Sequence, residues 1–228
     1  MSAVAAPVAA GVGVLGLAVG MLLNTVLYRV PSPWNVAGGT WRQYAVVEAL
    51  TAGAFVALVL RFGVTAQLPA YLYLAAVGIV LAMLEFDVRR VPDVIVLPSY
   101  VVSVLLLMPA GAAQGDWNPA QRSLLGMAAF IVIFFVLMLA YPFAVTGSDV
   151  KLAGLLGLDL GWVSWGTVLI GMLGSFALVG FGGVALAGNR RPAAHAVPFA
   201  PCLILSAVLA LLVTLPISTW YGSILGLA

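Results

Sequence analysis

Long stretches without a single charged residue dominate this chain of 228 residues, in which 64% of the residues are hydrophobic and only 7% are charged. The uncharged stretches cover residues 1–28, 62–84, 94–115, 123–148, 160–189 and 192–228. About 20 apolar residues are enough to cross the hydrocarbon core of a bilayer as a helix. The pattern therefore excludes an ordinary water-soluble domain and predicts a polytopic membrane protein.

Helices account for these stretches better than a barrel does, because the strands of a transmembrane barrel alternate in polarity over ~10 residues. We predict an all-α integral membrane protein, a single polytopic domain over residues 1–228, with about eight transmembrane helices. The first expected span has no basic residue before Arg29, so we expect it to be a retained span and not a signal peptide. The expected spans lie near 3–28, 44–60, 68–86, 94–110, 123–145, 150–160, 162–187 and 197–217.

The expected span at 150–160 is unusually short. At ~1.5 Å per residue it reaches only about half of a ~30 Å core, so we expect either a short, buried helix or a re-entrant one. Gly154, Gly157 and Gly161 would let this helix pack closely against its neighbours. Such packing suits a segment that is shielded from lipid.

The basic residues predict the orientation of the chain in the membrane. Arg61 and Arg122 fall on one side of the expected topology, and the other seven basic residues fall on the opposite side. Cytoplasmic loops of membrane proteins carry an excess of Lys and Arg. We therefore expect both termini outside and the connection before Asp149 inside.

Composition also narrows the chemistry. The net charge of +2 gives no case for nucleic-acid binding. The single cysteine, Cys202, excludes an intrachain disulfide and a Cys-based zinc site, and one histidine cannot build a metal site. We expect neither a metal nor a cofactor.

Acidic residues at the predicted inner face are candidates for chemistry. Asp149 lies at the edge of an expected span, where an ionisable group is costly to hold and is by default a functional candidate. Glu85 and Asp87 lie on the same predicted side. Two carboxyl groups from separate helices can share a proton, one acting as general base on a water and the other as general acid, as in aspartyl proteases. The alternative is that these acids are solvated loop charges paired with nearby basic residues.

Five segments resemble, in order, the motifs of the type IV prepilin peptidases, which are membrane aspartyl proteases. The run Asp149-Val150-Lys151-Leu152-Ala153 resembles the second catalytic motif of that family, Gly-x-Gly-Asp followed by a Val-Lys-Leu-like run. The match covers essentially the whole chain and agrees with the independently derived topology. The other four segments are residues 20–31, 41–48, 90–98 and 197–201.

The resemblance implies an aspartic-type endopeptidase that removes a basic leader from a prepilin or pseudopilin at the cytoplasmic face of a bacterial membrane. Asp149 matches the second catalytic aspartate. The first lies seven residues before the Pro that matches Pro92, which is the position of Glu85; Asp87 would serve if the loop had lost two residues. Beside the catalytic position, the residues expected to bind substrate are Lys151, Gly147 and Ser148.

Two departures from the family pattern bear on activity. Residues 32–43 form a short cytoplasmic loop where fuller members carry a region with Cys-x-x-Cys pairs, so much of the case for N-methyltransferase activity is missing. The turn before Asp149 reads Thr146-Gly147-Ser148 and not Gly-x-Gly. Glycines there would allow positive φ and close approach of a substrate backbone, which Ser148 permits less readily.

A different class of function uses the same acids for structure or proton passage, in a catalytically inactive relative or a small transporter. The sequence shows no obvious inverted repeat, which counts against transport. Glu48 lies one turn into the second expected span and could pair with Arg42.

Overall fold

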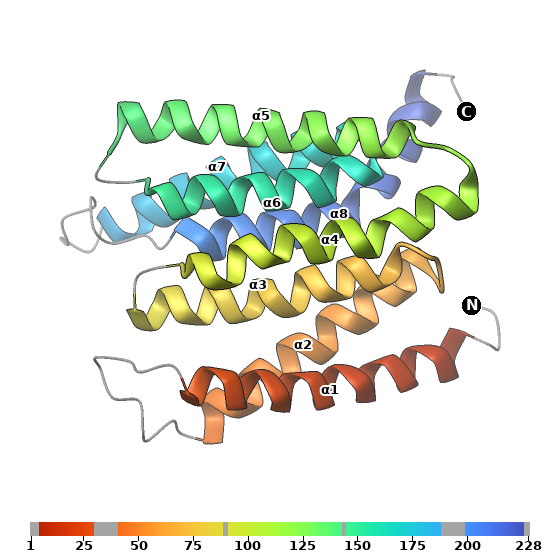
Figure 1. The fold of residues 1–228 in the computed structure, drawn as a ribbon, viewed down its shortest axis with the longest axis horizontal. Helices are drawn as coiled ribbons and strands as arrows, with labels where there is room; N and C mark the ends of the chain where they lie inside the picture. Colours follow the sequence, from red (N-terminus) through yellow and green to blue (C-terminus); the bar gives the residue numbers. More distant parts are fainter. Residues whose placement is uncertain (1–4, 30–40, 89–90, 143–144, 188–198, 226–228) are drawn as a thin grey trace. The chain divides into compact units, whose positions relative to one another are not determined.

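The computed structural model describes residues 5–29, 41–88, 91–142, 145–187 and 199–225. Within these residues the chain forms eight α-helices and is all-helical, as predicted (Figure 1). The helices are α1 (Ala5–Arg29), α2 (Trp41–Phe62), α3 (Leu68–Val88), α4 (Asp93–Gln114), α5 (Asn118–Ala140), α6 (Gly147–Val163), α7 (Trp165–Ala187) and α8 (Phe199–Leu225).

One helix begins and ends earlier in the sequence than predicted. The expected span at 123–145 is α5, which begins at Asn118 and ends at Ala140. Proline is favoured in the first turn of a helix, where its missing N–H needs no partner, and Pro119 occupies that place. Pro142 disfavours helical conformation at Tyr141, which is the residue after the last turn. Proline positions, and not hydrophobicity, therefore set both ends of α5.

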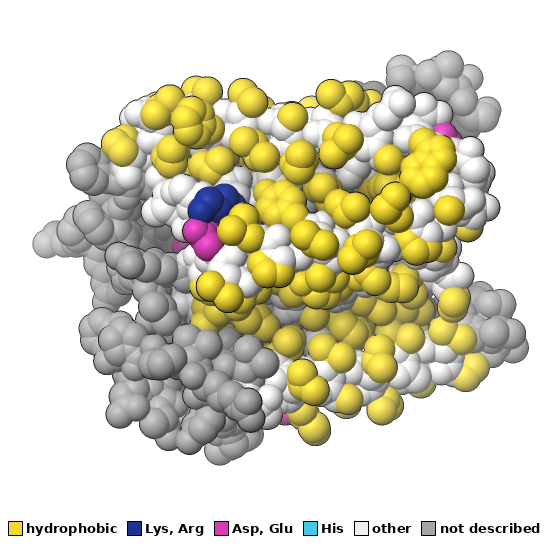
Figure 2. All heavy atoms as spheres, in the orientation of Figure 1, with side chains coloured by type: hydrophobic (Ala, Val, Ile, Leu, Met, Phe, Trp, Pro, Cys, Tyr) yellow, Lys and Arg dark blue, Asp and Glu magenta, His cyan; other side chains and the backbone are white. Residues whose placement is uncertain are grey.

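The helices expose apolar surface in the way that a membrane protein requires. Six of them, within α1 to α5 and α7, are long and apolar enough to cross a membrane, and the first part of α8, Phe199–Thr214, is a shorter apolar helix. Hydrophobic side chains cover the visible surface of α1 and α5 (Figure 2). On α5 the exposed large side chains are Leu124, Leu125, Val132, Ile133, Phe135, Val136 and Leu139. The chain is a multi-pass membrane protein.

The chain divides into two compact units, and the first contains residues 1–114 with helices α1 to α4. In this unit α1 packs against α2, α2 against α3, and α3 against α4. Glycine brings α1 and α2 close together, since a Cβ at Gly20 would lie 2.7 Å from the Cα of Glu48. Between α3 and α4, the hydroxyl groups of Tyr73 and Ser99 are hydrogen-bonded at 2.9 Å.

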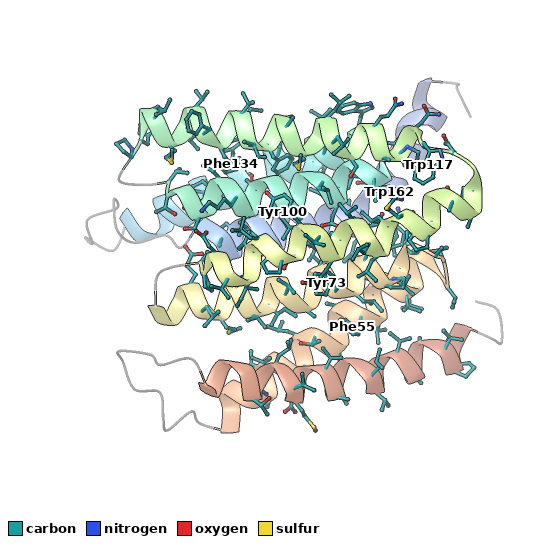
Figure 3. The ribbon with its side chains drawn as sticks, viewed as in Figure 1. Phe55, Tyr73, Tyr100, Trp117, Phe134 and Trp162 are labelled. Atoms are coloured by element: carbon teal, nitrogen blue, oxygen red, sulfur yellow. The ribbon has the colours of Figure 1, made fainter. Side chains whose placement is uncertain are left out.

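The second unit, residues 115–228, is built around α6. This helix contacts α5, α7 and α8 (Figure 1). Almost every residue from Asp149 to Trp162 is buried. Phe134 of α5 lies in the core of the unit, with ring centroids 5.6 Å from Phe176 of α7 and 5.8 Å from Phe199 of α8 (Figure 3). The short span expected at 150–160 is part of the 17-residue helix α6, which is longer than expected and buried within its unit.

Candidate active site

Asp149 lies in the first turn of α6, where its side chain caps the helix. Thr146, the residue before α6, has extended backbone dihedrals, with φ −105° and ψ 163°, and is the N-cap of the helix. Its backbone N–H donates to Oδ2 of Asp149 at 2.8 Å, and its hydroxyl donates to the same oxygen at 2.7 Å. A carboxylate at the third helical position that bonds back to the N-cap is the capping-box arrangement. The Asp149 carboxyl is therefore held in a fixed place.

The Asp149 carboxyl is also shielded from water. The residue is only 4% exposed, and it lies outside the six candidate spans. Burial raises the pKa of Asp149 above the usual range of an aspartate, while the two hydrogen bonds from Thr146 act in the opposite direction. A carboxyl with a raised pKa can hold a proton near neutral pH more readily than an exposed one, as a general acid must.

The residues between Thr146 and Asp149 belong to the helix. Gly147 and Ser148 are the first two residues of α6, and the positive-φ glycines among the described residues are Gly63 and Gly115. Ser148 therefore has helical backbone, in agreement with the expectation that a serine there permits positive φ less readily than a glycine. A Cβ at Gly147 would meet no described atom within 4 Å. The Ser148 hydroxyl lies 2.9 Å from that of Thr146.

Lys151 follows Asp149 by two residues in the same helix and is half-buried. Two residues along a helix correspond to about 200° of rotation, so the two side chains leave α6 on different sides. Its expected role in binding substrate stays a prediction.

The two acids of α3 belong to the first unit, whereas Asp149 belongs to the second. Helix α3 continues through both acids to Val88. Glu85 is half-buried, and Asp87 lies in the last turn, where only the helical backbone is described. Because the two are about 200° apart on one helix, at most one of them can face a given partner. The pairing of either acid with Asp149 stays a prediction.

The far end of α6 is anchored by a residue that we did not single out from the sequence. Arg122 of α5 donates from Nε to the carbonyl of Gly161 at 2.8 Å, and from Nη2 to the carbonyls of Trp162 and Val163 at 2.7 and 3.1 Å. These carbonyls are in the last turn of α6, where the helix offers acceptors without intrahelical donors and partial negative charge. Arg122 therefore fixes the C-terminal end of the helix that carries Asp149.

Close packing fixes α6 along its length. A Cβ at Gly157 would lie 2.5 Å from the carbonyl oxygen of Gly126 in α5, and one at Gly161 would lie 2.7 Å from that of Arg122. The hydroxyl of Ser123 also donates to the Leu158 carbonyl. The prediction of close packing is confirmed at Gly157 and Gly161. Together these contacts make α6 a rigid support for Asp149.

A second polar contact lies inside the first unit. The amide of Asn24 in α1, which is buried, donates to Oε1 of Glu48 in α2 at 3.3 Å. The side chain of Arg42, the partner that we expected for Glu48, lies outside the described part of the chain. Asn24 thus gives Glu48 a contact that the sequence analysis did not name.

Thr146 was also missed, although the sequence contained a signal for it. A Thr or Ser followed three residues later by an acid, just before an apolar run, marks the start of a helix. Thr146-Gly147-Ser148-Asp149 has that spacing and precedes the apolar residues of α6.

Among the described residues, no group of three or more His, Cys, Asp or Glu could hold a metal ion.

Fold and site together define a polytopic helical membrane protein with a buried, capped carboxyl at the start of an internal helix. Comparison with curated proteins identifies a distant homologue, the prepilin leader peptidase/N-methyltransferase of Bacillus subtilis (strain 168), which is 28% identical over 176 residues. The alignment covers 75% of this chain and 66% of that relative. The resemblance drawn from the motifs is confirmed at this level. No family model and no solved structure matches the chain.

Proposed function

We propose that this protein is a membrane aspartyl endopeptidase that cleaves the basic leader from prepilin-like proteins at the cytoplasmic face of a bacterial cytoplasmic membrane. The observation that carries the proposal is the buried carboxyl of Asp149, which is held by Thr146 at the start of α6. This carboxyl belongs to a chain with a distant homologue named as a prepilin leader peptidase.

The proposed reaction needs a second carboxyl, which we assign to Glu85 or Asp87 at the end of α3. One carboxylate takes a proton from a water molecule as the water attacks the scissile carbonyl carbon. The other carboxyl, protonated at that stage, donates its proton to the carbonyl oxygen. The first carboxyl then passes the proton that it took from water to the leaving amine as the C–N bond breaks, and the second regains its proton from the gem-diol hydroxyl. The raised pKa of Asp149 supports a site in which one of the two groups is protonated.

The proposed substrate has a short basic leader followed by an apolar helix. The bilayer would hold the apolar helix, and the junction with the leader would reach the first turn of α6. No described atom lies within 4 Å of a Cβ at Gly147, and we propose that an extended peptide backbone approaches there. Lys151 is proposed to bind the substrate backbone beside the scissile bond.

The relative's printed name includes an N-methyltransferase, but the alignment covers only 66% of its length. This chain has a short connection at residues 32–43, where the family resemblance implies a Cys-rich region. We propose that the peptidase activity is present without methylation, so that the released product keeps a free, unmethylated N-terminus.

The test is cleavage by the purified protein in liposomes, with a prepilin-like protein as substrate. Mass spectrometry of the products should show one cut, at the junction of the leader and the apolar helix, and no added methyl group. A matched substrate in which the basic residues of the leader are neutral serves as control and should be cut more slowly. Proton flux in the same liposomes is measured with a pH-sensitive dye. If the substrate stays intact and the flux depends on Asp149, the protein is a transporter and not a peptidase.

A further inference from the structure

Both departures of this chain from the Gly-x-Gly pattern are hydroxyl residues, and the structure places them in contact. Thr146 and Ser148 stand at the two glycine positions. Their hydroxyl oxygens are 2.9 Å apart, and the Thr146 hydroxyl lies 2.7 Å from Oδ2 of Asp149. A pair of glycines could make neither contact, so the two substitutions act on the carboxyl together.

The number of hydrogens on each hydroxyl group decides which group is the donor in each hydrogen bond. A hydroxyl has one hydrogen to donate and lone pairs to accept with. The hydrogen of Thr146 goes to Oδ2 of Asp149, so the contact with Ser148 requires Ser148 to be the donor. The chain of hydrogen bonds therefore runs from Ser148 through Thr146 to the carboxylate. Successive hydrogen bonds polarise one another, so Ser148 strengthens the bond that Thr146 makes.

The two oxygens of the carboxyl are thereby made different. Oδ2 receives both hydrogen bonds that Thr146 donates, one from its backbone N–H and one from its hydroxyl. Donors that point at Oδ2 occupy its lone pairs and disfavour a proton there. A proton on Asp149 is therefore directed to Oδ1.

We propose that Thr146 and Ser148 form a hydroxyl relay that positions Asp149, with Oδ2 held by the relay and Oδ1 left to exchange protons with the attacking water. The proposal rests on the proposed peptidase function for its reaction and on the geometry of the turn for the relay. Thr146 and Ser148 are positioning residues in this account, since they act on the substrate through Asp149.

Few other charged groups lie near the same carboxyl among the described residues of the second unit. Arg122 is bound to the opposite end of α6, and Asp159 is ten residues further along the helix, which corresponds to about 15 Å. Asp116 precedes α5 at that same far end, where its carboxylate accepts from Asn118. Lys151 is the described charged residue of this unit within one turn of Asp149. Removing a neutral hydroxyl leaves all of these charges in place.

The test combines activity with a direct titration of Asp149 in four variants. Thr146→Val removes the hydroxyl and keeps the shape, Thr146→Ser restores a hydroxyl, and Ser148→Ala is made alone and in the Thr146→Val background. Infrared difference spectra report the protonation of Asp149, with Asp149→Asn identifying its band. Thr51→Val, which removes a hydroxyl bonded to the Val47 carbonyl inside α2, is the matched control.

The relay predicts that the variants differ in the size of their effects on the pKa of Asp149 and on kcat, and that the effects of the changes at Thr146 and Ser148 do not add. Thr146→Val should raise the pKa of Asp149, because it removes a donor to the charged form, and should lower kcat by about tenfold with little change in KM. Thr146→Ser and Thr51→Val should behave like the wild type. Ser148→Ala should have a smaller effect of the same sign, and none in the Thr146→Val background.

Two results would overturn the relay. One is an unchanged titration of Asp149 in folded Thr146→Val protein, and the other is an equal effect of Ser148→Ala with and without the Thr146 hydroxyl. If the wild-type protein cleaves no prepilin-like substrate, the proposed function fails. The infrared titration of the same variants then decides the relay separately, because it needs no substrate.

Discussion

Two opposed effects act on the pKa of the Asp149 carboxyl. Burial disfavours its charge, whereas the Thr146 donors and the positive end of the α6 dipole favour it. The net effect is a raised pKa, so the folded protein holds this proton more tightly than the unfolded chain does. Folding stability should therefore fall as the pH rises from the ordinary aspartate pKa of ~3.9 to the raised pKa of the folded state.

Replacing Asp149 by Asn should remove this dependence on pH. The Asn side-chain oxygen can still accept the bonds from Thr146, and it carries no charge to desolvate. We expect the variant to unfold at a higher temperature than the wild type near neutral pH, with a difference that shrinks toward pH 4. Thermal unfolding in detergent, followed by circular dichroism across this pH range, measures the difference. A wild type that gains stability over the variant as the pH rises would contradict the prediction.

The identity of the first catalytic carboxyl also depends on single residues. Helix α3 includes both Glu85 and Asp87, and positions two residues apart on a helix are separated by about 200°, so only one of them can serve. The ungapped register favours Glu85, although an extra methylene shifts its carboxyl by ~1.5 Å relative to an Asp, which matters for a shared proton. We expect Glu85→Gln to abolish cleavage and Asp87→Asn to leave it largely intact. Loss in the Asp87 variant alone would reverse the assignment, and full activity in both variants would refute the two-carboxyl mechanism.

At the scale of elements, α6 depends on glycine for its place beside α5. Adding a Cβ at Gly157 would bring it to 2.5 Å from the Gly126 carbonyl oxygen and 2.9 Å from Cβ of Phe130. We expect Gly157→Ala to destabilise the protein by about 1–3 kcal/mol, as overpacking does. The matched control is Gly53→Ala in α2, since a Cβ there meets nothing within 4 Å and the change favours a helix.

Thermal unfolding of the two alanine variants beside the wild type tests this packing. The destabilised Gly157→Ala protein should also lose cleavage activity, because α6 carries Asp149. A Gly157→Ala protein that is as stable as the Gly53→Ala control would show that α5 and α6 do not pack as closely as described.

The sequence predicts the elements well where hydrophobicity alone decides them. Six uncharged stretches locate six of the eight described helices, whereas α2 and α6 contain charged residues and follow from shorter apolar runs. The bounds of α5 were wrong because prolines set them, and α6 was given too few residues because Asp149 and Ser148 were not counted as its first turn. A charged residue inside the first turn is compatible with a helix when it caps that turn.

The candidate site was predictable only in part. Asp149 stands out as an acid beside a long apolar run, and the motif resemblance points to the same residue. The bonds from Thr146 depend on the helix starting at Gly147, and the role of Arg122 depends on α5 and α6 lying antiparallel. Residues 39 to 41 positions apart meet there only through tertiary packing, which local patterns do not encode.

At the scale of the whole molecule, the orientation in the membrane follows from the basic residues. We expect a cysteine at Gly147, which is exposed, to face the cytoplasm, and one at Val64 or Gln114, also exposed, to face outward. Gln114 is preferable to Gly115, whose φ of +64° would strain a side chain. In a Cys202→Ser background, an impermeant thiol reagent applied to intact cells should label the two outer positions alone. Labelling at Gly147 would overturn the orientation.

The proposed activity requires the carboxyl of Asp149, and the removal of this carboxyl is the most direct test. Purified Asp149→Asn protein should fold as the wild type does, since the amide is nearly isosteric and can accept the bonds from Thr146. Its rate of cleavage of a prepilin-like substrate in liposomes should fall by at least about 100-fold, because an amide can neither take nor give the proton. Cleavage by the folded variant at the wild-type rate would contradict the account.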